Sequence, residues 1–213
     1  MDNNTSTIAI IVAHPDDETL WAGGTILSNP GKQYFIVCLC RKYDTDRAPK
    51  FEKVLRILGA EGIMGDLDDG PDQAQLPEHD VQTAILQLLP AKHFDLIITH
   101  SIYGEYTRHR RHEEIGRAVI NLWHSGKINT NELWAFAYED GHKAYLPVVN
   151  EDAPLFYPLT HDAWENKFNI ITKTYGFAWD SWEAQTTPKK EAFWQFKNAN
   201  QAQEWLDSGN IKS

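Results

Sequence analysis

Cysteine is scarce in this chain of 213 residues, which contains only Cys38 and Cys40. The two are separated by a single residue on a predicted strand, an arrangement that does not favour a disulfide between them. We therefore expect two small core residues in a reducing compartment, of which the cytoplasm is the simplest.

Basic residues and long apolar runs are also in short supply. Lysine and arginine number 20 against 30 aspartates and glutamates, which gives a net charge of −10 at pH 7. This acidity argues against nonspecific nucleic-acid binding and against a polybasic membrane anchor. Residues 1–7 are polar and the apolar run after them is short, so we expect neither a secretory signal nor a membrane span. The sequence leaves a homo-oligomer open.

The Gly-x-Gly-x-x-Gly pattern of dinucleotide-binding loops is missing as well. Gly23 and Gly24 follow the first apolar run, but acids stand where a pyrophosphate would have to bind.

The chain does contain apolar runs typical of strands, alternating with segments of helical spacing. This alternation predicts an α/β fold, a Rossmann-like three-layer αβα sandwich with a mostly parallel sheet. A single domain over residues 1–213 is expected, because the chain is long enough for one core and contains no linker. We predict strands at 7–13, 34–39, 62–64, 95–99 and 133–137, and helices at 19–28, 48–58, 80–89, 113–123, 161–175 and 189–206.

The most informative segment is the predicted strand 7–13 together with the residues that follow it. The strand runs into His14 and Pro15, and Pro15 favours a helix start directly after it. Ligands bind outside the carboxyl ends of strands in such sheets, so these polar residues fall at a site. Imidazole and carboxylate groups bind zinc, so His14 and Asp17 are suited to hold one ion, with Asp16 as general base for water. Helix capping explains the acids equally well, but it does not explain His14.

A second strand exit offers a third ligand. The predicted strand 95–99 leads to a polar loop, and His109 and His112 stand three residues apart near the start of the next predicted helix. An isolated pair of histidines is more typical of a solvated helix start. Beside a first strand exit that carries His14 and Asp17, a shared metal site is the stronger interpretation.

Together these segments resemble the signatures of the LmbE-like, or PIG-L, family of zinc-dependent N-acetylglucosaminyl de-N-acetylases. The family's Ala-His-Pro-Asp-Asp-Glu motif stands at residues 13–18, and its Gly-Gly at 23–24. Its second motif, His-Pro-Asp-His, stands as His109-Arg-Arg-His112, in which Arg111 replaces the acid that orients the first histidine.

The resemblance implies a role for each matching residue. His14, Asp17 and His112 would be the metal ligands, and Asp16 the general base. His109 would stabilise the oxyanion or protonate the leaving amine.

Weaker matches of the same resemblance concern substrate binding. Arg41, Arg47 and Asp69 correspond to the family's arginines and to its sugar-contacting aspartate. Each is also consistent with an ordinary loop charge, and for Asp69 on its own that is the favoured interpretation. From about residue 139 onward the resemblance fades.

Basic residues also gather in the loops expected at the metal-bearing sheet edge, Arg110 among them. They either balance the acids of the site or receive an anionic substrate, for which the arginine fork is well suited. Our hypothesis is that Arg110 helps to bind phosphate or another anion next to the acetamido sugar.

The sequence thus predicts a cytoplasmic zinc-dependent hydrolase that removes acetyl from a small N-acetylglucosamine-like substrate. Iron(II) fits the same ligands. Two alternatives stay open: a metal-dependent hydrolase of another amide, and a binding protein that keeps the fold and the metal without activity.

Overall fold

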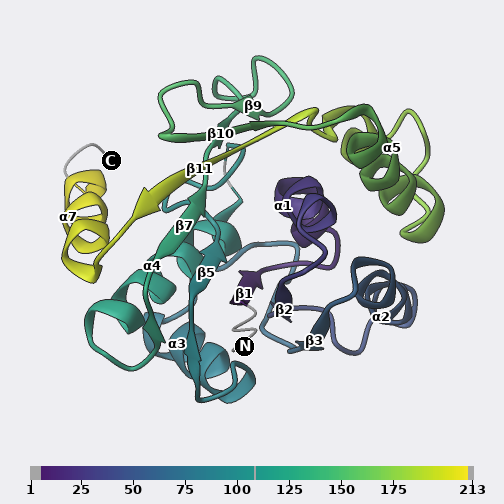
Figure 1. Ribbon diagram of the computed structural model, residues 1–213. Helices are drawn as coiled ribbons and strands as arrows, with labels where there is room; N and C mark the ends of the chain where they lie inside the picture. Colours follow the sequence, from purple (N-terminus) through teal and green to yellow (C-terminus); the bar gives the residue numbers. More distant parts are fainter. Residues whose placement is uncertain (1–5, 108, 211–213) are drawn as a thin grey trace, which may run out of the picture.

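The computed structural model describes residues 6–107 and 109–210, which are built around a seven-stranded sheet (Figure 1). The strands follow the order β10-β11-β7-β5-β1-β2-β3 across the sheet. Neighbouring strands are parallel from β7 to β3, whereas β11 runs antiparallel to β7 and β10 antiparallel to β11. Their bounds are β1 Thr7–Val12, β2 Gln33–Cys38, β3 Glu61–Met64, β5 Leu96–Thr99, β7 Leu133–Phe136, β10 Leu155–Pro158 and β11 Lys190–Phe196.

Two short ladders lie outside this sheet. One pairs β4 (His93–Phe94) with β6 (Asn129–Thr130), and the other pairs β8 (Tyr138–Glu139) with β9 (Val148–Val149).

Helices cover both faces of the sheet and complete three layers (Figure 1). One face carries α3 (Glu78–Leu88), α4 (Arg110–His124) and α7 (Ala199–Asn210); the other carries α1 (Asp17–Ser28), α2 (Arg47–Leu58), α5 (His161–Asn169) and the π-helix η1 (Ile170–Thr174). The short helix α6 (Trp182–Thr186) follows η1.

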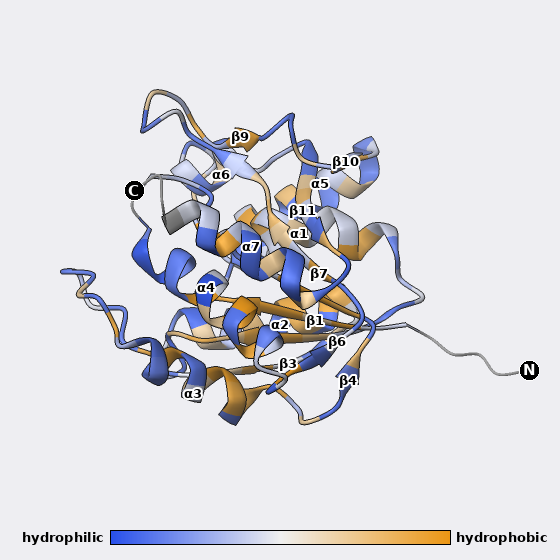
Figure 2. Cartoon of the chain, turned by 90° about the vertical axis from the view of Figure 1, so that its left-hand side faces the viewer, coloured by the Kyte–Doolittle hydropathy of each residue, from blue (hydrophilic) through white to orange (hydrophobic). Residues whose placement is uncertain are grey.

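Alternate residues of the central strand β1 enter two separate cores. Ala9 and Ile11 belong to one core and Ile10 and Val12 to the other. The apolar strands therefore lie between two helical layers whose outer surfaces are largely hydrophilic (Figure 2). Burial on both faces explains the nearly continuous apolar runs of these strands, and the predicted three-layer α/β fold is confirmed.

The C-terminal part differs from two predictions. The predicted helix 189–206 is wrong, because residues 190–196 form strand β11 and α7 begins only at Ala199. β11 is hydrogen-bonded to β7 on one side and to β10 on the other. These pairings between distant segments stabilise the strand, and the local periodicity of the sequence does not indicate them. The predicted helix 161–175 is α-helical only to Asn169 and continues as η1.

Cys38 and Cys40 are free and buried, as expected for two small core residues. Among residues 6–107 and 109–210, no helix has the length and apolar character needed to cross a membrane.

The sheet brings the two predicted strand exits together. β1 and β5 are parallel neighbours, and Ile11 is paired with Thr99 near their carboxyl ends. The loops that follow these strands therefore leave the same edge side by side. Gly116 lets α4 pack closely on the second exit, because an added Cβ would lie 2.5 Å from the carbonyl oxygen of His100.

A buried ion pair between Lys167 and Glu191 fastens the C-terminal elements to α1. The Nζ atom of Lys167 lies 2.7 Å from Oε1 of Glu191, and both side chains are inaccessible to solvent. Glu191 also accepts hydrogen bonds from the backbone N–H groups of Gly24 and Thr25 at 2.8 and 2.7 Å.

A Lys167→Met variant is expected to lower the free energy of unfolding by about 3–5 kcal/mol, because it leaves a buried carboxylate without its counter-charge. Equilibrium urea denaturation measures this loss. The matched control is Lys173→Met at an exposed position of η1, which is expected to change the free energy by less than about 0.5 kcal/mol. Equal effects of the two substitutions would contradict the structural role of the pair.

Candidate active site

Three side chains from the two strand exits place their donor atoms close together. His14 follows β1, Asp17 opens α1, and His112 lies in the first turn of α4. The Nδ1 atom of His14 and the Nε2 atom of His112 lie 3.2 and 3.3 Å from Oδ2 of Asp17, and 3.3 Å from each other. A tetrahedral ion with bonds of about 2.0–2.1 Å requires ligand atoms about 3.3 Å apart. The triangle therefore has the size that a tetrahedral zinc ion requires.

Carboxylates behind the two histidines fix which ring nitrogen faces this triangle. Nδ1 of His112 lies 2.5 Å from Oε2 of Glu105, and Nε2 of His14 lies 3.2 Å from Oδ1 of Asp69. An imidazole that donates one N–H to a carboxylate keeps its other nitrogen unprotonated and available to a metal.

His100 and Glu105 form the deepest part of the site, and sequence reasoning assigned neither of them. Oε2 of Glu105 accepts from Nδ1 of His100 at 2.8 Å, and the ring of His100 stacks on that of His112 with centroids 3.8 Å apart. His100 also lies within a second group of metal-ligating atoms with Asp17 and His112. Its Nε2 atom, however, accepts the backbone N–H of Ala13 at 2.9 Å, so we assign it a supporting role. The only signal in the sequence was the position of His100 directly after β5.

Replacement of Glu105 by glutamine is expected to weaken metal affinity by about 10- to 100-fold, because carboxylates that orient ligating histidines contribute on that scale. Titration calorimetry with zinc measures the affinity. Glu61→Gln, on the exposed start of β3, is the matched control. Unchanged affinity in a folded Glu105→Gln protein would remove Glu105 from the support of the site.

Asp16 lies beside the triangle in an unusual backbone conformation, with φ 125° and ψ −29°. Such a conformation costs a non-glycine residue on the order of 1–3 kcal/mol. Its Oδ2 atom accepts from Nη1 of Arg47 at 3.0 Å. Burial raises the pKa of Asp16 well above its usual range, the charge of Asp17 adds to this, and Arg47 opposes it. A carboxyl group with a raised pKa is a better proton acceptor than an exposed one.

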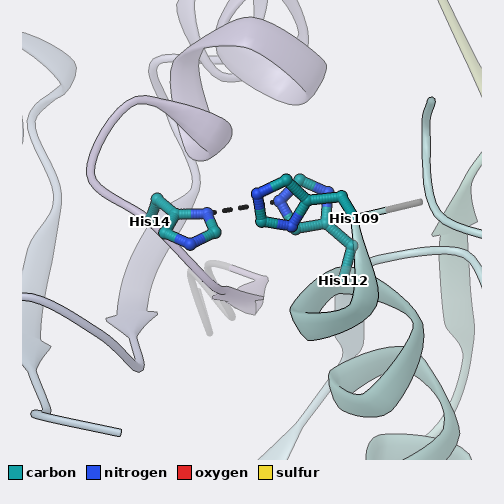
Figure 3. A group of neighbouring side chains, drawn as sticks. All are labelled: His14, His109 and His112. Carbon is teal, nitrogen blue, oxygen red and sulfur yellow. Dashed lines mark hydrogen bonds between the residues drawn. The ribbon is translucent and has the colours of Figure 1, made fainter. Parts of the chain in front are cut away.

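His109 stands at the N-cap of α4, with its ring facing those of His14 and His112 (Figure 3). The centroid distances are 4.7 and 4.0 Å. Burial lowers the pKa of His109 to about 2, and the nearby His112 and His14 lower this pKa further. Its buried Nδ1 atom has no hydrogen-bond partner among the described residues. The site therefore contains a neutral imidazole whose Nδ1 atom has no hydrogen-bond partner among residues 6–107 and 109–210, although its ring packs against those of Tyr106 and His112.

Arg111 points away from the histidines. Its guanidinium donates to the backbone oxygens of Asp68 and Ala74 at 2.5 and 2.8 Å and pairs with Glu114. Arg111 thus secures the loop that carries Asp69. Although Arg111 replaces the family acid, His109 and His112 keep their places beside His14.

A cavity of about 710 Å³ opens above these groups. The predicted substrate residues Arg41, Arg47 and Asp69 line it, and Nη2 of Arg41 lies 2.5 Å from Oδ2 of Asp69. Arg110 is exposed and is not among the lining residues. Aromatic and charged residues that sequence reasoning did not assign complete the wall, among them Tyr106, Lys143, Tyr145 and Trp182.

The sequence matches a known protein family and a viral relative. The family model described as GlcNAc-PI de-N-acetylase, or PIG-L, matches residues 9–123. Uncharacterized protein L374 of Acanthamoeba polyphaga mimivirus is 22% identical over 184 residues, which are 79% of this chain and 75% of that protein.

Solved structures of low identity show the same fold. The N,N'-diacetylchitobiose deacetylase from Pyrococcus horikoshii superposes with a TM-score of 0.68 at 18% identity, covering 91% of this chain and 85% of its own. The A40926 pseudoaglycone deacetylase Dbv21 gives 0.59 at 15% identity, with 92% and 99% covered. GalB, the 4-carboxy-2-hydroxymuconate hydratase from Pseudomonas putida KT2440, gives 0.61 at 15% identity, with 90% and 96% covered. Deacetylases and a hydratase share this fold, so the fold alone does not specify the reaction.

The match to the family model rests on the part of the chain that builds the site. Residues 9–123 are more than half of the 213 residues, and they include both strand exits with His14, Asp17 and His112. This chain therefore belongs to the PIG-L (GlcNAc-PI de-N-acetylase) family.

Proposed function

We propose that this protein is a metal-dependent hydrolase that removes acetyl from an N-acetylglucosamine-like sugar conjugate bearing an anionic group. The products would be acetate and a free amine. The observation that carries the proposal is the triangle of His14, Asp17 and His112, with Asp16 beside it at the base of a cavity. Membership of the PIG-L family supports the same reaction.

Each group at the base of the cavity has a place in amide hydrolysis. A zinc or iron(II) ion held by His14, Asp17 and His112 would polarise the acetamide carbonyl and acidify water. Asp16 would accept the proton of the attacking water. The neutral ring of His109 would donate a hydrogen bond to the oxyanion that develops. Asp16, which then holds the proton taken from water, would pass that proton to the departing amine.

The cavity also indicates the kind of substrate. Its volume of about 710 Å³ lies in the range of small-molecule pockets. Arg41 and Arg47 are engaged by Asp69 and Asp16, whereas no ion pair is found for Lys143 among the described residues. We therefore propose Lys143 as a cation for the anionic group, with Arg110 as an outer contact.

The proposal is tested by following amine release with an amine-reactive dye. Metal-loaded and chelated protein are each incubated with N-acetylglucosamine conjugates that carry a phosphate or no charge. We expect amine only from the loaded protein, faster turnover of the phosphorylated conjugate, and loss of that preference in Lys143→Ala and Arg110→Ala. If the two conjugates were turned over at equal rates, and neither variant changed those rates, the anionic group would be removed from the proposal. Release only from unrelated amides would favour the alternative hydrolase, and binding without turnover would favour the binding protein.

A further inference from the structure

We propose that the segment from Tyr175 to Phe177 positions Asp16 from two sides, a role that rests on the proposed use of Asp16 as general base. The segment follows the π-helix η1. It lies outside residues 9–123, which match the family model. The C-terminal part of the chain would thus contribute to the active site without lining the metal triangle.

The backbone of Asp16 requires support, because its φ of 125° is one that residues with a side chain rarely adopt. Such a conformation persists only where surrounding contacts enforce it. The N–H group of Asp16 donates to Oε2 of Glu18 at 3.1 Å. The position of Asp16 therefore depends on how firmly Glu18 is held.

Glu18 is fully buried, and Tyr175 is its long-range partner. The hydroxyl of Tyr175 donates to Oε1 of Glu18 at 2.8 Å across 157 positions of sequence, and the adjacent Thr19 hydroxyl donates at 2.6 Å. A buried carboxylate needs such donors, because leaving it unpaired is costly. Tyr175 thereby acts on the backbone of Asp16 through one intervening side chain.

The π-helix places this tyrosine. The N–H group of Tyr175 donates to the carbonyl oxygen of Ile170 at 2.9 Å, which closes the wide turn. Gly176 then adopts a φ of +81° and redirects the chain. Single π-turns of this kind are frequent at functional sites.

Phe177 reaches the side chain of Asp16 by a second route. The guanidinium carbon of Arg47 lies 4.4 Å from the ring centroid of Phe177. Nη1 of the same guanidinium donates to Oδ2 of Asp16 at 3.0 Å. An aromatic face of this kind attracts and orients an arginine. One segment therefore holds the backbone of Asp16 through Glu18 and its carboxylate through Arg47.

Tyr175→Phe and Phe177→Leu test the two routes separately. Each is expected to lower kcat of the metal-loaded protein by about 10- to 100-fold, because a misplacement of about 1 Å has an effect of this size. KM and metal content are expected to stay at the wild-type values. Phe177→Tyr keeps the aromatic face and is expected to retain the wild-type kcat. The proposal would be overturned if both Tyr175→Phe and Phe177→Leu kept the wild-type kcat. It would also be overturned if their kcat fell only in proportion to a loss of bound metal.

Tyr138→Phe is the matched control, since Tyr138 is also buried and its hydroxyl donates to the backbone oxygen of Trp21 at 3.2 Å. The kcat of Tyr138→Phe is expected to equal that of the wild type. If its kcat fell as far as that of Tyr175→Phe, the effect would be due to the loss of any buried hydroxyl, and the proposal would be overturned.

Combination with Asp16→Asn separates this inference from the proposed function. If Tyr175 acts through Asp16, Tyr175→Phe has no further effect on kcat in the Asp16→Asn background. A full additional loss there would overturn the positioning role. A wild-type rate in Asp16→Asn alone would instead refute the proposed base. A slow Asp16→Asn protein together with wild-type rates in Tyr175→Phe and Phe177→Leu would leave the base in place and refute the positioning.

Discussion

Asp16→Asn is expected to lower kcat by a factor on the order of 10²–10⁴ while the protein still binds its metal, because the amide cannot accept a proton from water. Asp16 lies beside the donor triangle and is not one of its corners. Steady-state kinetics on protein loaded with a defined metal, together with the measured metal content, separates loss of chemistry from loss of the ion.

The matched control is Asp46→Asn, an exposed acid at the N-cap of α2 that neighbours Arg47 in sequence. Its kcat is expected to equal that of the wild type. If Asp16→Asn kept a near-normal rate with full metal content, Asp16 would have no part in the mechanism. If it lost the metal, Asp16 would belong to the ligands.

His112→Ala is expected to abolish both metal binding and turnover. His112 belongs to each group of metal-ligating atoms found among the described residues, and its ring is fixed by Glu105. Loss of a direct ligand should weaken affinity by more than the roughly 10- to 100-fold known for supporting residues.

Thermal unfolding with and without metal gives a readout independent of activity. An ion at about 100 times its dissociation constant stabilises the folded state by about 2.7 kcal/mol, which corresponds to a rise in Tm of roughly 5–10 °C for a chain of this size. We expect that rise in the wild type and in Asp16→Asn, and its absence in His112→Ala. His124→Ala, in the exposed last turn of the same helix, is the control that should keep it.

His109 provides a further distinction within the same experiment. Its ring nitrogens lie near those of His14 and His112, and together they form one of the groups that is close enough to hold an ion. Our assignment makes His109 an oxyanion donor, so His109→Ala should keep the metal-induced rise in Tm while kcat falls. Loss of the rise would make His109 a ligand.

The predicted strands β1 and β5 and the residues at their exits follow from local patterns. Apolar runs buried on both faces identify the strands, and Pro15 identifies the end of the first of them. Neighbouring parallel strands bring His14, Asp17 and His112 to one edge, and the structure places them together. Their roles in catalysis remain predictions.

The supporting residues could not be predicted in the same way. Glu105 lies in an irregular loop, where no periodicity indicates which way a side chain points. The predicted helix 189–206 failed for a related reason, because β11 depends on partners on both of its sides.

The sequence by itself determined the layered α/β architecture and the residue types delivered to the sheet edge, because strand burial and the exits of β1 and β5 are properties of short contiguous segments. Only the tertiary structure decided how those residues are held. It turned Arg111 away from the histidines, set Glu105 behind His112, and brought Tyr175 to Glu18 across 157 positions. Contacts of that range depend on how whole elements pack, and no local pattern in the chain specifies them.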